Sequence, residues 1–306
     1  MATAYKWTYD MAGMNFTPHP PMLYWVSPTG NDVTGDGTNL LPWATWAYAA
    51  TQATVPGDVI HGAAGTYTET AQIVLAPGVD MIGAGITTII TTATALDPII
   101  LLSSASEGIN GNQSISYIKI DGNLTAAAGI GIYARKNVVV HHCEFIDLLN
   151  QGLLYSGLVR GSADGAPAVY PTGNDIYNNS FTNCGLEIYS APYYFATGAL
   201  YLGGQANSLI YNNTIDNVTG GRYGYGIKYV YGGYNKGLDI YDNTILISPK
   251  HVADNQWSYA IEFWNQRGGM KIHNNTIQGA VDMGSVKRYM RTIFPLPHYN
   301  HIRRVE

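Results

Sequence analysis

The phrase "IYNNTI" at 210–215 decides the fold, because the chain repeats it. Variants stand at 176–181 ("IYNNSF"), 240–245 ("IYDNTI") and 272–277 ("IHNNTI"), and a divergent copy, "VVHHCEF", lies at 139–145. Counted between their second asparagines (Asn179, Asn213, Asn243 and Asn275), the four clear copies are 34, 30 and 32 residues apart. A fixed phrase with variable spacers is typical of a solenoid whose loops vary in length at one corner.

The residues around each copy favour β-strands over helices. Stretches such as "SLIYNNTI" and "GLDIYDNTI" are short, alternate in polarity and are rich in β-branched and aromatic residues. Another strand-like piece precedes the later copies, at 198–204, 225–233 and 259–266. One coil therefore reads as strand, short corner, strand, Asn corner, strand and long corner, which predicts an all-β protein built as a parallel β-helix.

The asparagines have a structural explanation. Asparagine tolerates the left-handed backbone that a sharp corner needs, and amides stacked about 4.8 Å apart can hydrogen-bond along the solenoid axis. We therefore expect the repeat to hold the fold and the chemistry to lie elsewhere. In the divergent copy, we align His141 and His142 with the Asn pair; we expect corner residues there, with a metal-binding role as the alternative.

Composition excludes some classes of function. Only 12% of the residues are charged and the net charge is −5, which argues against a nucleic-acid partner because such proteins normally carry a basic face. No run of 18 apolar residues is present, so we expect no membrane span, and the first residues show no secretion signal. Cys143 and Cys184 lie at different offsets from their repeats, so we expect two small buried side chains rather than a disulfide.

The segment 24–69 predicts a strand, a Gly/Asp loop, a helix at about 43–53 and a first coil. Its string "VSPTGND…PWATWAYAA…VPGDVI…GTYTE", together with the Asn phrases, resembles the pectin-lyase-like right-handed parallel β-helix superfamily. It is most similar to the chondroitinase B and alginate lyase group, family six of the polysaccharide lyases. The resemblance implies a single-stranded right-handed parallel β-helix with an N-terminal capping helix that covers the open end of the solenoid.

The domain boundaries follow from the limits of these patterns. We expect an N-terminal extension at 1–23, the β-helix at 24–281 and an irregular or poorly ordered tail at 282–306. The tail holds 5 of the 16 Lys and Arg residues and contains no Asn phrase.

A groove is expected where long corners (182–197, 216–225 and 246–258) lead into the following strands. Alignment of the repeats predicts two outward columns on those strands, with neighbours about 4.8 Å apart: Gly131, Tyr201, Lys228 and Glu262 in one, and Tyr133, Gly203, Val230 and Trp264 in the next. Sugars stack on aromatic rings and uronates pair with arginine. The candidate substrate-binding residues are Arg222, Tyr223, Tyr225, Trp257, Trp264 and Tyr193.

The resemblance also implies site chemistry. In that group a lysine is the base, an arginine assists, and Asn and Glu side chains hold Ca²⁺. By position, Lys228 would be the base, Arg267 or Arg222 the assistant and Tyr201 a catalytic neighbour. The calcium ligands would be Glu187 and Glu262, since Ca²⁺ prefers several oxygen ligands. An ordinary salt bridge between Lys228 and Glu262 is the alternative for that pair.

The expected function is cleavage of an acidic, uronate-containing polysaccharide by β-elimination, in an extracellular, cell-surface, periplasmic or virion-associated protein. A glycoside hydrolase that uses Glu187 and Glu262 as paired carboxylates is one alternative. A non-catalytic carbohydrate-binding or adhesion module, such as a tail spike, is the other, because all three classes share this scaffold.

Overall fold

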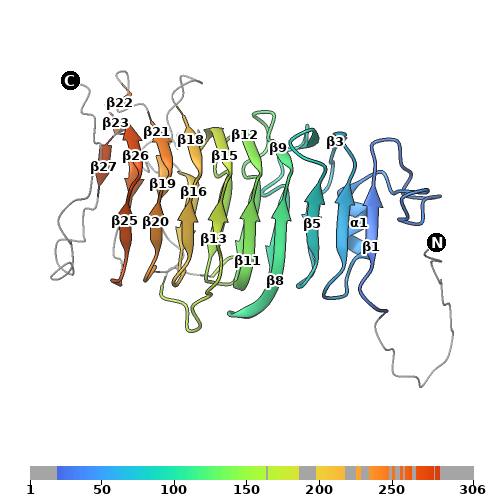
Figure 1. Ribbon diagram of the computed structural model, residues 1–306, viewed down its shortest axis with the longest axis horizontal. Helices are drawn as coiled ribbons and strands as arrows, with labels where there is room; N and C mark the ends of the chain where they lie inside the picture. The colour runs from blue at the N-terminus through green and yellow to red at the C-terminus, as the bar shows by residue number, and fades with distance from the viewer. Residues whose placement is uncertain are drawn as a thin grey trace.

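The computed structural model describes residues 19–162, 165–185, 198–217, 225–228, 234–247, 250–251, 256–257, 259–263, 267–278 and 280–282. In these residues three parallel β-sheets run along one axis, with one strand of each sheet in a typical coil (Figure 1). The fold is the predicted all-β, single-stranded, right-handed parallel β-helix, and right-handed crossovers are the rule for parallel strands.

Sheet A holds nine strands, namely β1 (Leu23–Val26), β2 (Val59–Gly62), β5 (Asp80–Gly83), β8 (Ile109–Ser116), β11 (Arg135–His141), β14 (Ile176–Tyr177), β17 (Leu209–Tyr211), β20 (Asp239–Tyr241) and β25 (Lys271–His273). Sheet B holds β3 (Gly65–Thr68), β6 (Thr88–Thr91), β9 (Lys119–Asp121), β12 (Glu144–Leu148), β15 (Ser180–Cys184), β18 (Thr214–Asp216), β21 (Thr244–Leu246) and β26 (Thr276–Gln278). Sheet C holds β4 (Ile73–Val74), β7 (Ile100–Ser103), β10 (Ile130–Tyr133), β13 (Leu153–Ser156), β16 (Gly198–Gly203), β19 (Tyr225–Lys228), β24 (Tyr259–Glu262) and β27 (Ala280–Asp282). A separate antiparallel pair is formed by β22 (Lys250–His251) and β23 (Gln256–Trp257).

The interior of the solenoid is filled by the apolar member of each alternating pair. Ile176, Ile210 and Ile240 are fully buried and follow one another in the register of sheet A. In sheet B the rings of Phe145 and Phe181 stack with centroids 4.6 Å apart. Because every coil repeats the same alternation, each strand buries one face against the axis and presents the other outward.

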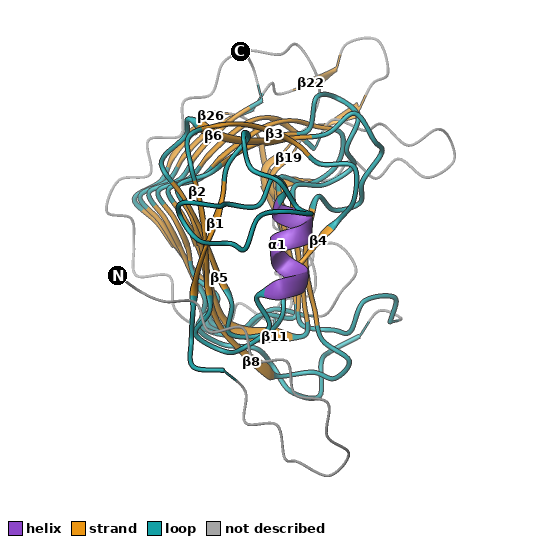
Figure 2. Ribbon diagram, turned by 90° about the vertical axis from the view of Figure 1, so that its right-hand side faces the viewer, coloured by secondary structure: helices purple, strands orange, loops and turns teal. Residues whose placement is uncertain are grey.

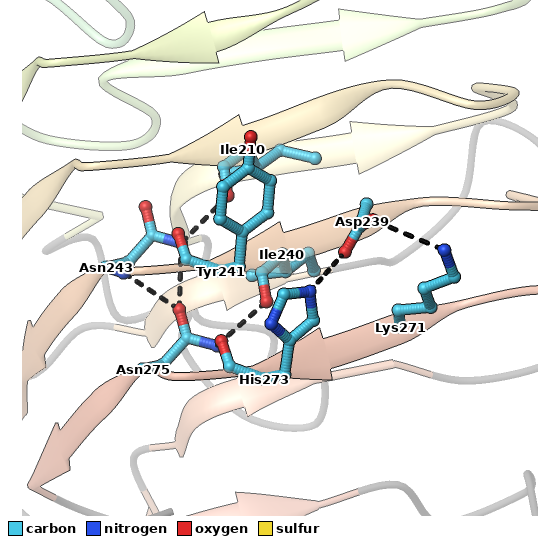
Figure 3. Close-up of polar contacts among 8 residues, drawn as sticks. All are labelled: Ile210, Asp239, Ile240, Tyr241, Asn243, Lys271, His273 and Asn275. Atoms are coloured by element: carbon cyan, nitrogen blue, oxygen red, sulfur yellow. Dashed lines mark hydrogen bonds and ion pairs between the residues drawn. The ribbon is translucent and has the colours of Figure 1, made fainter. Parts of the chain in front are cut away.

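The two residues of the Asn corner between sheets A and B have different structural roles. The first has a positive φ of 53–55° in Asn178, Asn212, Asp242 and Asn274, a conformation that Asn and Asp adopt at lower cost than most residues. The second is buried, and its amide donates to the next along the axis, from Asn179 to Asn213, Asn243 and Asn275, at 2.9–3.1 Å. Figure 3 shows the last step, in which Asn243 and Asn275 also donate to the carbonyls of Ile210 and Ile240.

The divergent copy needs a correction to its alignment. In the register His141 pairs with Tyr177, and Glu144 pairs with Ser180. The two histidines therefore stand in place of the Tyr–Asn pair, and not of the Asn–Asn pair. Cys143 takes the position of the second asparagine, and its backbone N–H donates to Asn179.

Helix α1 (Trp46–Gln52) lies across the N-terminal end of the coil (Figure 2), shorter than the predicted 43–53. Two acidic side chains hold its first turn: Asp32 accepts from Ala44 and Thr45, and the buried Glu69 accepts from the backbone N–H groups of Trp46 and Ala47. The buried indole of Trp46 lies over Gly62, where a Cβ would come within 2.1 Å of the ring. The helix thus covers the apolar end of the solenoid.

Both cysteines are buried free thiols, as expected. Among the described residues, no helix is long and apolar enough to cross a membrane. The predicted extension at 1–23 and tail at 282–306 lie almost wholly outside the described residues.

Candidate functional site

The outward column of sheet C changes character along the axis. Its first four members are Val74, Leu101, Gly131 and Leu154. The next three are Tyr201, Lys228 and Glu262, paired in successive strands. The prediction that these three residues are neighbours on successive strands is confirmed. Gly131 does not adjoin Tyr201 in this column, because Leu154 lies between them. In this column the polar side chains therefore begin at β16 and continue through β19 and β24.

Lys228 and Glu262 form an ion pair, with Nζ 3.0 Å from a carboxylate oxygen. Although both residues lie on the outward face of the sheet, their side chains are only 3% and 8% exposed. Among the described residues, two other lysine ion pairs lie on outer faces: Lys119–Glu144 on sheet B and Lys271–Asp239 on sheet A, where Lys271 is 71% exposed. The sheet C pair is thus the most enclosed of the three, and burial of two charges is costly unless each has a partner.

The environment of Lys228 lowers its pKa. Burial is the larger influence and lowers the pKa, whereas the charge and hydrogen bond of Glu262 raise it. In the structure burial therefore outweighs the neighbouring carboxylate. A lowered pKa makes the neutral form of a lysine, which can act as a general base, easier to reach.

Two tyrosines complete the described part of the site. The ammonium of Lys228 lies 3.6 Å from the ring centroid of Tyr225, a cation–π contact. Tyr201 is half-buried and pairs with Lys228 in the register, about one strand spacing of 4.8 Å away. The four residues place a base candidate, a carboxylate and two phenols in one patch, which we call the sheet C cluster.

Arg267 lies at the corner that follows sheet C. It is exposed, its guanidinium sits 4.9 Å from the ring centroid of Tyr234, and its backbone N–H donates to the carbonyl of Asn235. These two contacts join Arg267 to the corner rather than to the sheet C cluster. Its assisting role stays a prediction.

Several predicted site residues cannot be placed. Glu187, Tyr193, Arg222, Tyr223 and Trp264 lie outside the described residues, and Trp257 is described only through the backbone of β23. Val230 of the second predicted column also lies outside the described residues. In that column Ser156 lies between Tyr133 and Gly203.

Sequence reasoning missed Asp282. Strand β27 pairs with β24, which sets Asp282 beside Glu262 in the register. The predicted tail began at 282 because β27 has no Asn phrase; the short alternation "QGAVD" was the available signal.

The described residues do not make a calcium site. Glu262 is already neutralised by Lys228, and no cluster of three His, Cys, Asp or Glu side chains is found in the described part of the chain. Ca²⁺ needs about six to eight oxygen ligands, so we assign it no step.

Comparisons with known proteins were made for the whole chain. No protein-family model matches it, and no curated protein matches its sequence.

Several solved structures share its general shape. An alginate lyase from Paenibacillus sp. str. FPU-7 is 12% identical, over 76% of this chain and 93% of its own, with a TM-score of 0.42. The pectate lyase Pel9A is 13% identical, over 86% and 73%, with a TM-score of 0.49. A polygalacturonase from Erwinia carotovora ssp. carotovora is 11% identical, over 88% and 78%, with a TM-score of 0.49. At such identities the likeness concerns the fold alone.

Proposed function

We propose that this protein cleaves an acidic, uronate-containing polysaccharide by β-elimination on the outer face of sheet C, as the resemblance to the chondroitinase B and alginate lyase group implies. The observation that carries the proposal is the enclosed Lys228–Glu262 ion pair at outward positions. Four preceding members of the same column are apolar or glycine, so the fold does not require charge there. Ionisable groups with shifted pKa values cluster at functional sites, and the pKa of Lys228 is lowered by burial. We also propose that the protein works outside the cell or on a virion, where such polymers occur.

In this proposal neutral Lys228 removes the proton from the carbon alpha to the uronate carboxylate. The electron pair forms the C4–C5 double bond, and the bond from C4 to the leaving oxygen breaks. Tyr201, one strand away, donates a proton to that oxygen. Tyr225 and Glu262 hold the amine in place. The arginines predicted to pair with the uronate, Arg222 and Arg267, remain part of the proposal.

A hydrolase is the second candidate, and one observation favours it. Glu262 and Asp282 are register partners, so two carboxylate-bearing residues occupy neighbouring strands about 4.8 Å apart. Retaining glycosidases hold their two carboxyl groups about 5–5.5 Å apart.

The test is a panel of polyuronates and glycosaminoglycans, with Ca²⁺ or a chelator, in which ultraviolet absorbance and reducing ends are followed together. The wild type should produce both signals, because elimination creates an unsaturated sugar at each cut. Lys228→Arg should lose at least about 100-fold in rate, since arginine keeps the cation beside Glu262 but does not deprotonate. Asp282→Asn is the matched control and should stay active.

Other outcomes point elsewhere. Reducing ends without absorbance, lost in Glu262→Gln and Asp282→Asn, would establish the hydrolase. Binding without either signal would replace both reactions by a carbohydrate-binding module.

A further inference from the structure

The corner at 141–142 departs from the repeat that surrounds it. The next two coils carry Tyr177–Asn178 and Tyr211–Asn212 at this corner and the preceding coil carries Ser116–Tyr117, whereas this coil carries two adjacent histidines. His142 keeps the positive φ of the corner, at 54°. That backbone conformation turns its ring back toward the ring of His141, so the two imidazoles meet at the outer surface between sheets A and B.

The two rings converge through one nitrogen each. Nδ1 of His141 lies 2.8 Å from Nδ1 of His142, with the ring planes at 86°. Each ring is also fixed from its face: His141 stacks on Tyr177 at 4.9 Å and 1°, and His142 stacks on Tyr117 at 4.9 Å and 19°. The pair is therefore preorganised, which reduces the entropy that a ligand must overcome.

The remaining ring nitrogens have polar partners. Nε2 of His141 lies 3.2 Å from Oγ of Ser114, whose backbone N–H is held by Asp80. Nε2 of His142 lies 3.2 Å from the side-chain amide of Asn178. In the metal-free pair one Nδ1 carries a proton and donates it to the lone pair of the other, because two lone pairs or two protons could not approach this closely.

We propose that His141 and His142 form a binding site for a divalent transition-metal ion, of the class Zn²⁺, Ni²⁺ or Cu²⁺, through their two Nδ1 atoms. The proton on Nδ1 of one ring moves to its Nε2, so both Nδ1 lone pairs become ligands. Ser114 Oγ, and the amide oxygen of Asn178 after a flip, then accept from the two Nε2–H groups. Metal-bound histidines usually donate their other N–H in this way.

The geometry sets the adjustment that the pair must make. Zn–N bonds of about 2.0–2.1 Å at a tetrahedral angle separate two nitrogens by about 3.3 Å. The Nδ1 atoms must therefore open by about 0.5 Å from their 2.8 Å contact, and each ring must tilt so that its Nδ1 lone pair points to the shared ion.

The donor set selects the ion. Imidazole suits zinc, copper and nickel, whereas Ca²⁺ and Mg²⁺ prefer oxygen. Cys143 is not a third ligand: it is buried, its thiol contacts the carbonyls of Ile115 and His141, and burial raises its pKa to about 12. No set of three His, Cys, Asp or Glu ligands occurs among the described residues. Water or an exogenous ligand fills the remaining positions, so the ion is exchangeable.

The experiment measures Zn²⁺ binding by calorimetry on the chelator-treated full-length chain. His142→Asn and His141→Tyr install the residues that neighbouring coils already carry at these positions, so the corner should keep its fold. Each should weaken Zn²⁺ binding by at least tenfold. His273→Tyr is the matched control. The register of sheet A places His273 in line with His141, through Tyr177, Tyr211 and Tyr241, and its ring faces Asp239 (Figure 3), so this substitution should leave the site intact.

A second readout does not depend on affinity. Cu²⁺ added to the wild type should give an electron paramagnetic resonance spectrum with coupling to two imidazole nitrogens, and His142→Asn should lose one of them. Equal Zn²⁺ binding by the wild type and a folded His142→Asn variant would overturn the assignment. So would a copper spectrum that the two substitutions leave unchanged.

Discussion

At position 228 a single ammonium group lies at an outward strand position, yet its side chain is only 3% exposed. Its charge is held by the carboxylate of Glu262 and the ring of Tyr225. Replacement of such a pair by apolar residues is often neutral, whereas loss of one partner leaves a buried charge without its counter-ion. Because each charge depends on the other, we expect substitutions at either residue to change the free energy of unfolding as well as activity.

The first stability prediction concerns this pair. Lys228→Met should lower the free energy of unfolding by about 3–5 kcal/mol, because the Glu262 carboxylate loses the cation that neutralises it. The double variant Lys228→Met/Glu262→Leu should recover most of that loss. Denaturant unfolding of the four members of the cycle measures the coupling. The control, Lys119→Met, breaks a more solvent-exposed pair and should cost under about 1 kcal/mol; equal costs at both sites would contradict the argument.

Acidic side chains hold the start of helix α1. Glu69 is buried and accepts from the N–H groups of Trp46 and Ala47. Burial raises its pKa, and the two backbone hydrogen bonds lower it by less. Since the folded-state pKa is raised, the contribution of Glu69 to stability is fully present below its ordinary pKa and decreases as the pH rises through the folded-state value.

This sign gives a prediction for two substitutions. Glu69→Gln should gain stability relative to the wild type as the pH rises from about 4.5 toward neutrality, because glutamine keeps an acceptor for the helix without a charge. Glu69→Ala should be destabilising across the whole range, since two buried N–H donors lose their acceptors. Thermal unfolding at a series of pH values measures both. If the wild type instead became more stable relative to Glu69→Gln as the pH rises, the pKa of Glu69 would be shifted in the opposite direction.

At the scale of the molecule, the solenoid is a stack in which each coil contacts mainly the coils on either side. Stability in such folds is approximately a sum of coil and nearest-neighbour terms. The 30-residue step from Asn213 to Asn243 therefore defines a unit that could be removed. Thr214 and Thr244 are register partners. They therefore occupy equivalent positions in successive coils.

Deletion of residues 214–243 joins Asn213 to Thr244 and restores the "IYNNTI" phrase. The product should unfold cooperatively with a denaturant m-value lower by roughly one ninth, one strand of the nine in sheet A. It should lack the proposed β-elimination activity, because Lys228 is removed. Deletion of 214–242 instead shifts the strand by one residue, turns Ile245 outward and should prevent folding; survival of both deletions would show that register does not determine the fold.

Much of this architecture could be predicted because it repeats. The Asn phrases fixed the strands of sheets A and B, and the alternation of apolar residues identified Tyr201, Lys228 and Glu262 as neighbours. The prediction from the repeat failed where a coil lacks the Asn phrase. Leu154 was overlooked because a long segment separates its strand from the next phrase, and Asp282 because β27 lies beyond the last one.

The state of the site could not be predicted from the pattern. Register gives which residues are adjacent but says nothing of how deeply they are buried. The pKa of Lys228 depends on that burial, and it reverses the balance expected from charge alone. Likewise, the alignment of His141 with Tyr177 required the actual hydrogen-bonded register.

The outer column that begins at His141 continues through Tyr177, Tyr211, Tyr241 and His273, with successive ring centroids 4.9–5.3 Å apart and planes within 12°. Both faces of Tyr177, Tyr211 and Tyr241 are covered by their neighbours in the column. Parallel phenol chromophores at this separation couple electronically and share excitation. The column is thus an intrinsic optical probe: its near-ultraviolet circular dichroism arises from the stacking of neighbouring coils, and would diminish when they separate even if each strand remained extended.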